Sequence, residues 1–304
     1  MTSITSSHQT RTASLWRRFE APTWLLCTAI YGGWFSLTAS FHALPWWVVL
    51  PLGAWLVAWQ NSLQHEIVHG HPTRWRWLNE TLAYAPLGLV MAYPRYRSSH
   101  LKHHATATLT CPQDDPESFY IGKADWRKMN VVFRLLLTAN NTLLGRFVLG
   151  PALSYYAFWR GARLHRSEFM GYAAHAAALG AVIWWITSYC GIPFWAYVAL
   201  FAYPGMSLTL MRSYLEHRPA DDQAGRTAIV ERAPLFGLLF LNNNLHTMHH
   251  DHPALPWYEL PRIYKKERRE VLEHNGNYFF AGYLDVARRY LLRPKDSPAH
   301  PGFD

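Results

Sequence analysis

Hydrophobic residues are concentrated in four long stretches that contain no Lys, Arg, Asp or Glu. These stretches are residues 24–41, 46–63, 169–189 and 193–211. At about 1.5 Å per residue, helices of this length are roughly 27–31 Å long, which matches the hydrocarbon core of a bilayer. Short connectors separate the two members of each pair. The pattern therefore predicts an all-α integral membrane protein with four transmembrane helices in two hairpins.

Two further apolar stretches do not fit a simple span. Residues 81–94 are uncharged, but they are too short to cross a bilayer and contain helix-breaking residues, so we expect them to lie in the interface or to re-enter. Residues 129–159 are mostly apolar but carry Arg134 and Arg146, which favours an amphipathic helix on the membrane surface. Both stretches are expected to contribute to a helical cap on the cytoplasmic side.

The distribution of charge predicts which side of the membrane the loops occupy. The chain has 29 Lys and Arg against 20 Asp and Glu, a formal net charge of +9, and neither hairpin turn contains Lys or Arg. By the positive-inside rule, the remaining segments are cytoplasmic, including both termini and the polar tail of residues 1–20. The 16% charged residues are fewer than the roughly 25% usual in soluble domains, which makes a soluble bundle of buried helices the less favoured alternative. Nucleic acid is not an expected partner, because the basic residues do not gather in a soluble fold.

Histidines recur in motifs that the predicted topology places at or just below the cytoplasmic boundary of the membrane. The first motif reads HEIVH, the second HLKHH and the third HTMHH, and one more histidine follows the fourth span. Residues at i, i+3 and i+4 share a helical face, so we expect the rings of each motif to project from the same side of its helix. The candidate metal ligands are His65, His69, His100, His103, His104, His217, His246, His249 and His250, with His71 as a possible extra ligand.

Nine imidazoles exceed the coordination sphere of one metal ion. Neutral imidazole is a good ligand for Fe, Zn, Cu and Ni, so the set predicts a di-metal site with about four or five nitrogens per ion. Ligating histidines usually donate their second ring N–H to a nearby acceptor. Polar residues beside the motifs are the candidates for that role: Glu66, Asp114, Asp115, Glu216, Asp251 and Asn242.

With its three motifs in this order around two predicted hairpins, the chain resembles the membrane fatty acid desaturase/hydroxylase superfamily over residues 24–257. The resemblance implies a di-iron oxidoreductase that uses O2 and forms a double bond in a lipid or similar aliphatic chain. Hydroxylation or ketone formation on the same scaffold is the alternative. No cytochrome domain or ferredoxin-like cysteine set is recognisable, so a separate ferredoxin-, rubredoxin- or cytochrome-type protein would supply electrons. Residues 111–118 and 252–261 are most similar to small bacterial members, which implies a bacterial cytoplasmic membrane.

One position departs from the acyl-CoA desaturase pattern, and one motif allows a different enzyme class. Those desaturases have an Asn four residues before the extra histidine, where it holds a metal-bound water. This chain has Ser213 at that position, and an Asn within residues 242–244 is the candidate to hold the water instead. The HEIVH motif is also an HExxH sequence, which in zinc metalloproteases binds the metal and supplies a glutamate base, here Glu66. That alternative, like a metal-binding sensor or carrier, leaves the second and third motifs without a catalytic role.

Overall fold

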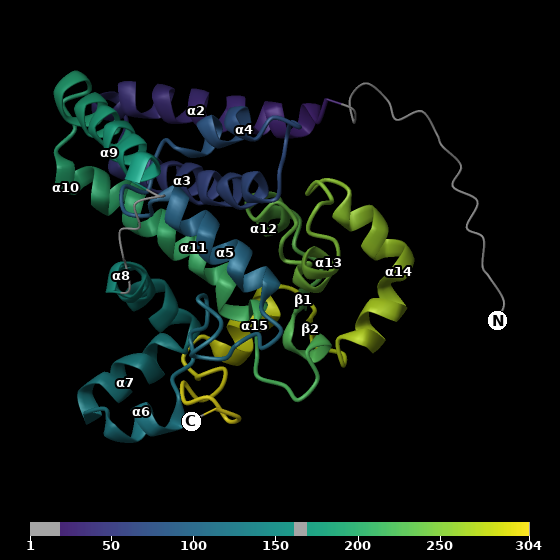
Figure 1. The fold of residues 1–304 in the computed structure, drawn as a ribbon. Helices are drawn as coiled ribbons and strands as arrows, with labels where there is room; N and C mark the ends of the chain where they lie inside the picture. Colours follow the sequence, from purple (N-terminus) through teal and green to yellow (C-terminus); the bar gives the residue numbers. More distant parts are fainter. Residues whose placement is uncertain (1–18, 161–168, 304) are drawn as a thin grey trace.

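The computed structural model describes residues 19–160 and 169–303, and this part of the chain is mostly helical (Figure 1). The polar tail predicted at residues 1–20 lies outside the described residues except for its last two. Helix α2 spans Ala21–Ala39 and helix α3 spans Trp46–Val68, close to the first two predicted spans. The other two predicted spans are also helical, each with a π-helical segment. Their elements are α9 (Phe169–Trp184) with a π-helical turn (Trp185–Tyr189), then α10 (Phe194–Tyr197), a second π-helical turn (Val198–Ala202) and α11 (Tyr203–Glu216).

Two continuous helical stretches in the described residues are long and apolar enough to cross a membrane. They are Phe169–Tyr189 and Phe194–Glu216. Although α2 and α3 form where spans were expected, the four-span topology and the cytoplasmic cap stay predictions. The two hairpin turns lie beside each other, since the His42 ring nitrogen Nε2 is 3.1 Å from the Cys190 carbonyl oxygen. Both turns are therefore at the same end of the helical bundle.

Helix α3 is the central element, with α2 on one side and α11 packed closely on another. Glycine allows this approach: a Cβ on Gly53 would lie 2.7 Å from the Phe201 ring, and one on Gly205 would lie 2.5 Å from Val57. Small residues at helix contacts are typical of helices that pack within membranes. The close packing fixes the C-terminal end of α3 relative to that of α11, and both ends carry candidate ligands.

The stretch at residues 81–94 is irregular after α4 (Arg76–Ala83) and lies against α3. Two side chains of α3 satisfy its backbone: Gln60 Nε2 donates to the Ala85 carbonyl at 2.9 Å and Gln64 Nε2 to the Ala83 carbonyl at 2.7 Å. These bonds provide the partners that irregular backbone would need at the membrane depth predicted for this stretch, because lipid offers none.

The single amphipathic helix expected over residues 129–159 is instead two helices, α7 (Val131–Asn140) and α8 (Leu143–Arg160). The break follows from capping: the Thr142 hydroxyl accepts the Gly145 N–H at 2.9 Å and begins the second helix. Helix α7 nevertheless exposes a large apolar surface, as expected for a helix at the membrane surface. Its exposed apolar residues include Val131, Val132, Phe133 and Leu135.

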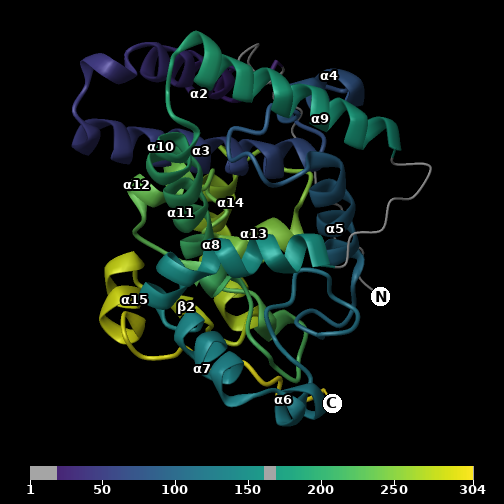
Figure 2. The same cartoon turned by 90° about the vertical axis from the view of Figure 1, so that its left-hand side faces the viewer.

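The remaining elements lie on one side of α3, below it in the view of Figure 2. These elements are α5 (Tyr93–Ala105), α6 (Lys123–Lys128), α12 (Pro234–Leu239), α13 (His246–Asp251), α14 (Leu260–His274), α15 (Tyr283–Tyr290), β1 (Ile229–Val230) and β2 (Phe279–Phe280). The strands pair in parallel, a small departure from the all-α expectation. Strand β1 also positions the start of α13, because the Val230 N–H donates to the Asn244 carbonyl at 2.8 Å.

Candidate metal centre

The nine predicted ligands lie on four segments that are far apart in the sequence. Helix α3 carries His65 and ends at Val68, so His69 is its C-terminal cap rather than part of its last turn. The second motif lies on α5 and the third on the short helix α13. His217 follows α11 in extended conformation. Packing of these elements brings all nine rings together.

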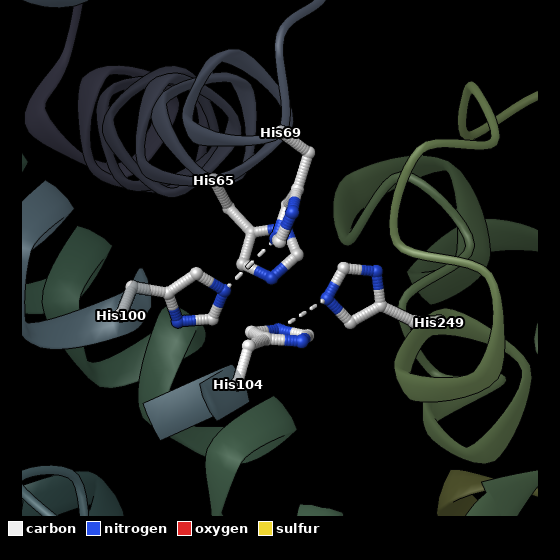
Figure 3. Close-up of side chains that lie close together, drawn as sticks. All are labelled: His65, His69, His100, His104 and His249. Atoms are coloured by element: carbon white, nitrogen blue, oxygen red, sulfur yellow. Dashed lines mark hydrogen bonds between the residues drawn. The ribbon is translucent and has the colours of Figure 1, made fainter. Parts of the chain in front are cut away.

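The rings form two groups, and within each group the ligating atoms all lie within 4.8 Å of one another. We call them the five-nitrogen group and the four-nitrogen group. The five-nitrogen group (Figure 3) comprises His65, His69, His100, His104 and His249. The four-nitrogen group comprises His103, His217, His246 and His250.

The Nε2 atoms face one another within each group. In the five-nitrogen group, His69 Nε2 is 3.1 Å from His100 Nε2, and His104 Nε2 is 3.0 Å from His249 Nε2. In the four-nitrogen group, His246 Nε2 lies 3.0 Å from that of His217 and 3.1 Å from that of His250. Nitrogens that converge in this way are arranged to share a cation.

The two HxxHH motifs each contribute to both groups. On α5, the adjacent residues His103 and His104 point to different groups, and their ring planes are 89° apart. The groups touch where the rings of His104 and His250 stack, with centroids 4.3 Å apart. Each HxxHH helix therefore connects the two sites, which explains why three rings occur at this spacing.

The environment keeps most of these rings neutral. Burial, together with the neighbouring His100 and His104, lowers the pKa of His69 to about 2. Burial, followed by electrostatic repulsion from His100 and His103, lowers the pKa of His104 to about 3. For His249 too, burial and the neighbouring rings lower the pKa well below its usual value. Neutral imidazole is the form that binds metal.

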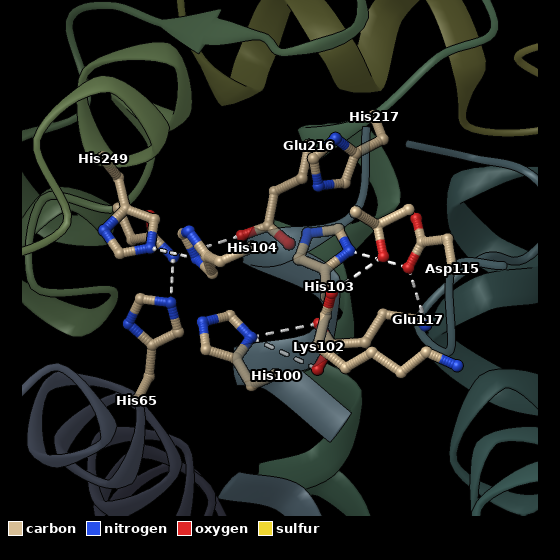
Figure 4. Close-up of polar contacts among 12 residues, drawn as sticks. His65, His100, Lys102, His103, His104, Asp115, Glu117, Glu216, His217 and His249 are labelled. Carbon is tan, nitrogen blue, oxygen red and sulfur yellow. Dashed lines mark hydrogen bonds and ion pairs between the residues drawn. The ribbon is translucent and has the colours of Figure 1, made fainter. Parts of the chain in front are cut away.

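His103 behaves differently, because it is held by a buried carboxylate. Burial alone would lower its pKa, but the hydrogen bond to Asp115 reverses the effect and raises it. The His103 Nδ1 atom is 2.8 Å from an Asp115 oxygen (Figure 4). Asp115 itself accepts the backbone N–H groups of Thr110 and Glu117, each at 2.9 Å. This arrangement fixes the ring's orientation and directs Nε2 into the four-nitrogen group.

A second carboxylate contact was missed at the sequence level. Both carboxylate oxygens of Glu117 are 3.2 Å from His100 Nδ1. Glu117 lies in the loop between α5 and α6, where no periodicity marks a residue as facing the site. Its only sequence signal is its position two residues after Asp115.

Glu216 and Asn243 form the third support. Glu216 pairs with Arg212 at 2.7 Å and has an oxygen 3.5 Å from His246 Nδ1. The Asn243 side-chain oxygen is 3.0 Å from the same Nδ1, and its amide nitrogen is 3.2 Å from His65 Nε2. Asn243 thus contacts one ring of each group. By contrast, Ser213 donates weakly to the Leu210 carbonyl within its own helix, at 3.4 Å.

Other candidates have different partners. The Asn242 amide donates to the Trp257 carbonyl at 3.0 Å, and Asp251 is exposed at the end of α13. Glu66 accepts the Trp257 backbone N–H at 2.8 Å. The possible extra ligand His71 belongs to neither nitrogen group, and its Nδ1 is 2.7 Å from Glu20. These residues therefore surround the centre without contacting its rings in the way that Asp115, Glu117 and Asn243 do.

The donor chemistry fits a pair of borderline transition-metal ions. An all-imidazole set suits iron, zinc or copper, and five plus four nitrogens correspond to two incomplete coordination spheres that leave room for another ligand. Calcium and magnesium prefer oxygen donors and fit poorly.

The chain matches a known protein family. The model of the family described as fatty acid desaturase matches residues 41–282, which include all nine rings. No curated protein matches the chain significantly.

Proposed function

Because this chain belongs to the fatty acid desaturase family, we propose that it is a membrane di-iron oxidoreductase that uses O2 to introduce a double bond into an acyl or similar aliphatic chain. The observation that carries the proposal is the convergence of nine imidazoles from four segments into two groups. The five-nitrogen group would hold one iron and the four-nitrogen group the other. When bound, the two irons supply the oxidising power that no side chain has.

The protein's own residues orient and protect this centre. Asp115, Glu117 and Asn243 hold the outer ring nitrogens of His103, His100 and His246, which fixes the direction of each Nε2 atom. Burial keeps the other rings neutral and therefore able to bind metal.

The proposed enzyme sits in a membrane with the metal centre at the cytoplasmic boundary. The two apolar hairpins with uncharged turns support this orientation, as does the exposed apolar surface of α7. Its substrate is an acyl or other aliphatic chain, and a separate ferredoxin-, rubredoxin- or cytochrome-type protein delivers the electrons. Double-bond formation and hydroxylation use the same ligand set, so the product identifies the reaction.

The position of Glu66 speaks against a zinc metalloprotease. In that mechanism the HExxH glutamate must reach a metal-bound water. Here its carboxylate accepts the Trp257 N–H and lies 4.0 Å from His71 Nε2, a ring outside both nitrogen groups.

Profiling of lipids and metabolites in cells that express the full chain tests the proposal. We expect a product that has lost two hydrogens, absent from cells expressing His104→Ala. Purified protein should contain about two irons per chain. A product that has gained one oxygen would identify a hydroxylase, and a single zinc per chain with no oxidised product would contradict the proposal.

A further inference from the structure

A small pocket adjoins the four-nitrogen group but is separate from its ligating atoms. Its walls include Phe119, Tyr120, Arg146, Tyr214 and Lys295, and it shares His217 with the metal centre. The pocket therefore combines two cationic side chains with one wall of the candidate iron site.

Arg146 is an unusual wall residue, because it is a charged side chain that is only 3% exposed. Its guanidinium carbon lies 4.1 Å from the centroid of the Phe119 ring and 5.9 Å from that of Tyr214. Stacking on a ring leaves the N–H edge of a guanidinium available for acceptors. Yet Arg146 Nε has no hydrogen-bond partner among the described residues.

The charges around the pocket do not balance. Lys295 pairs with Asp296 at 3.1 Å and also donates to the His217 carbonyl at 2.9 Å. Asp296 further accepts the Tyr120 hydroxyl at 2.6 Å. Asp296 also acts on Arg146 through space, but no described residue is hydrogen-bonded to Arg146 Nε. The two cations of the pocket wall, Arg146 and Lys295, therefore share this one carboxylate.

Arg146 nevertheless keeps its charge at neutral pH. Burial lowers its pKa to about 10, and the nearby Tyr214, Tyr120 and Asp296 counteract part of that effect. A buried cation without a counter-charge is costly, so such a side chain normally has an anionic partner.

We propose that this pocket binds a carboxylate group that pairs with the Arg146 guanidinium. One missing negative charge matches a carboxylate, and the planar fork of arginine pairs with carboxylate through two parallel hydrogen bonds. The carboxylate belongs either to the oxidised substrate or to a separate small acid. Any effect on turnover rests on the proposed function, whereas binding itself does not.

Binding is tested with sodium acetate as the probe, on the full chain in detergent. A ligand that binds only the folded state raises its thermal unfolding temperature. We expect acetate to raise this temperature for the wild-type protein. The apparent affinity should fall at least about tenfold in Arg146→Gln, because a charge-assisted pair is lost.

Two further variants separate binding from general stability. Arg127→Gln removes one positive charge from an exposed position on α6 and should keep the acetate response. Arg146→Lys keeps the buried charge but not the fork, so it should fold and still bind acetate more weakly than the wild type. The proposal is overturned if acetate does not stabilise the wild type, if chloride at equal ionic strength stabilises it as much, or if Arg127→Gln loses as much affinity as Arg146→Gln.

Kinetics with an aliphatic acid and its methyl ester identify the source of the carboxylate. If the substrate supplies it, Arg146→Gln raises KM for the free acid at least about tenfold and leaves KM for the ester unchanged. If a separate acid supplies it, the variant changes acetate binding while the two KM values respond alike. Absence of any oxidised product from either compound would count against the proposed function, and the acetate-binding result would still stand.

Discussion

The five-nitrogen group and the four-nitrogen group share the two HxxHH motifs, yet they are held in different ways. In the four-nitrogen group, His103 is anchored at 2.8 Å by Asp115, whose side chain is 1% exposed. In the five-nitrogen group, His100 is anchored at 3.2 Å by Glu117, whose side chain is 29% exposed. One ring is therefore fixed by a buried carboxylate and the other by a carboxylate that reaches solvent.

This difference indicates unequal rigidity of the two sites. Hydrogen bonds in a water-excluded environment are stronger and less exchangeable than those that compete with solvent. The four-nitrogen group is thus preorganised by its surroundings. The five-nitrogen group depends more on the helices that carry its rings, namely α3, α5 and α13.

The largest expected effect comes from removing one ring of either group. His249→Ala takes a nitrogen from the five-nitrogen group and His246→Ala takes one from the four-nitrogen group. Each change should abolish product formation and lower the iron content towards one per chain, because the remaining donors hold that ion weakly. Metal analysis of purified protein measures the loss, and product analysis measures the activity.

His252→Ala is the matched control for these variants. His252 is exposed, lies two residues after the third motif and belongs to neither group. It should keep both irons and full activity. Retention of both irons by His249→Ala or His246→Ala would remove those rings from the ligand set.

A smaller effect should distinguish the two anchors. Loss of an anchoring carboxylate typically costs about 10–100-fold in metal affinity. We expect Asp115→Asn to fall in that range and Glu117→Gln to lose less than about tenfold, since solvent already weakens its contact. The rate of iron loss to a chelator compares the two variants. Equal rates would show that the two groups are held alike.

The sequence predicts which rings form the centre but not which of the two nitrogen groups each ring belongs to. Spacing at i, i+3 and i+4 identifies His103 and His104 as neighbours on one helix face. Their assignment to different groups depends on how α11 and α13 pack against α5, which is tertiary information. The same limit applies to Glu117, whose loop follows no period, and to Asn243, which local sequence cannot separate from the asparagines on either side.

The fold shows the same division between local and tertiary information. Long uncharged stretches predict α2, α3 and the two later helices to within a few residues. The Thr142 cap that separates α7 from α8 follows Asn140 and Asn141, and three polar residues in a row are a local signal for a break. The mean hydropathy of residues 129–159 does not reveal this signal. Strands of two residues, such as β1 and β2, are too short for any alternating pattern to reveal.

Asn243 contacts one ring of each group but should support only the four-nitrogen group. Asn243→Ala removes the oxygen that holds the outer Nδ1 of His246, so the iron of the four-nitrogen group should be held less tightly. The Asn243 amide contacts Nε2 of His65, which faces the five-nitrogen group, so the iron there should be unaffected. The control is Asn242→Ala. Asn242 has φ +58°, a conformation that costs alanine about 1 kcal/mol, so this variant should lose stability but keep its iron. Equal loss of iron from both sites in Asn243→Ala would contradict this assignment.

The smallest effect is expected at Glu66, which lies between two ligands in the sequence and outside both groups in space. Gln at this position can still accept the Trp257 N–H, so Glu66→Gln should keep its irons and its product. Loss of the carboxylate's charge near His71 should lower the free energy of unfolding by about 1 kcal/mol or less, because the hydrogen bond from the Trp257 N–H is weakened rather than removed. For a domain larger than 150 residues, this corresponds to a fall in Tm of about 4 °C or less. A general base of a metalloprotease would behave in the opposite way, since Glu66→Gln would abolish turnover while leaving Tm unchanged. Measuring Tm and product formation on one preparation of Glu66→Gln therefore separates a residue that supports the fold around the centre from one that performs its chemistry.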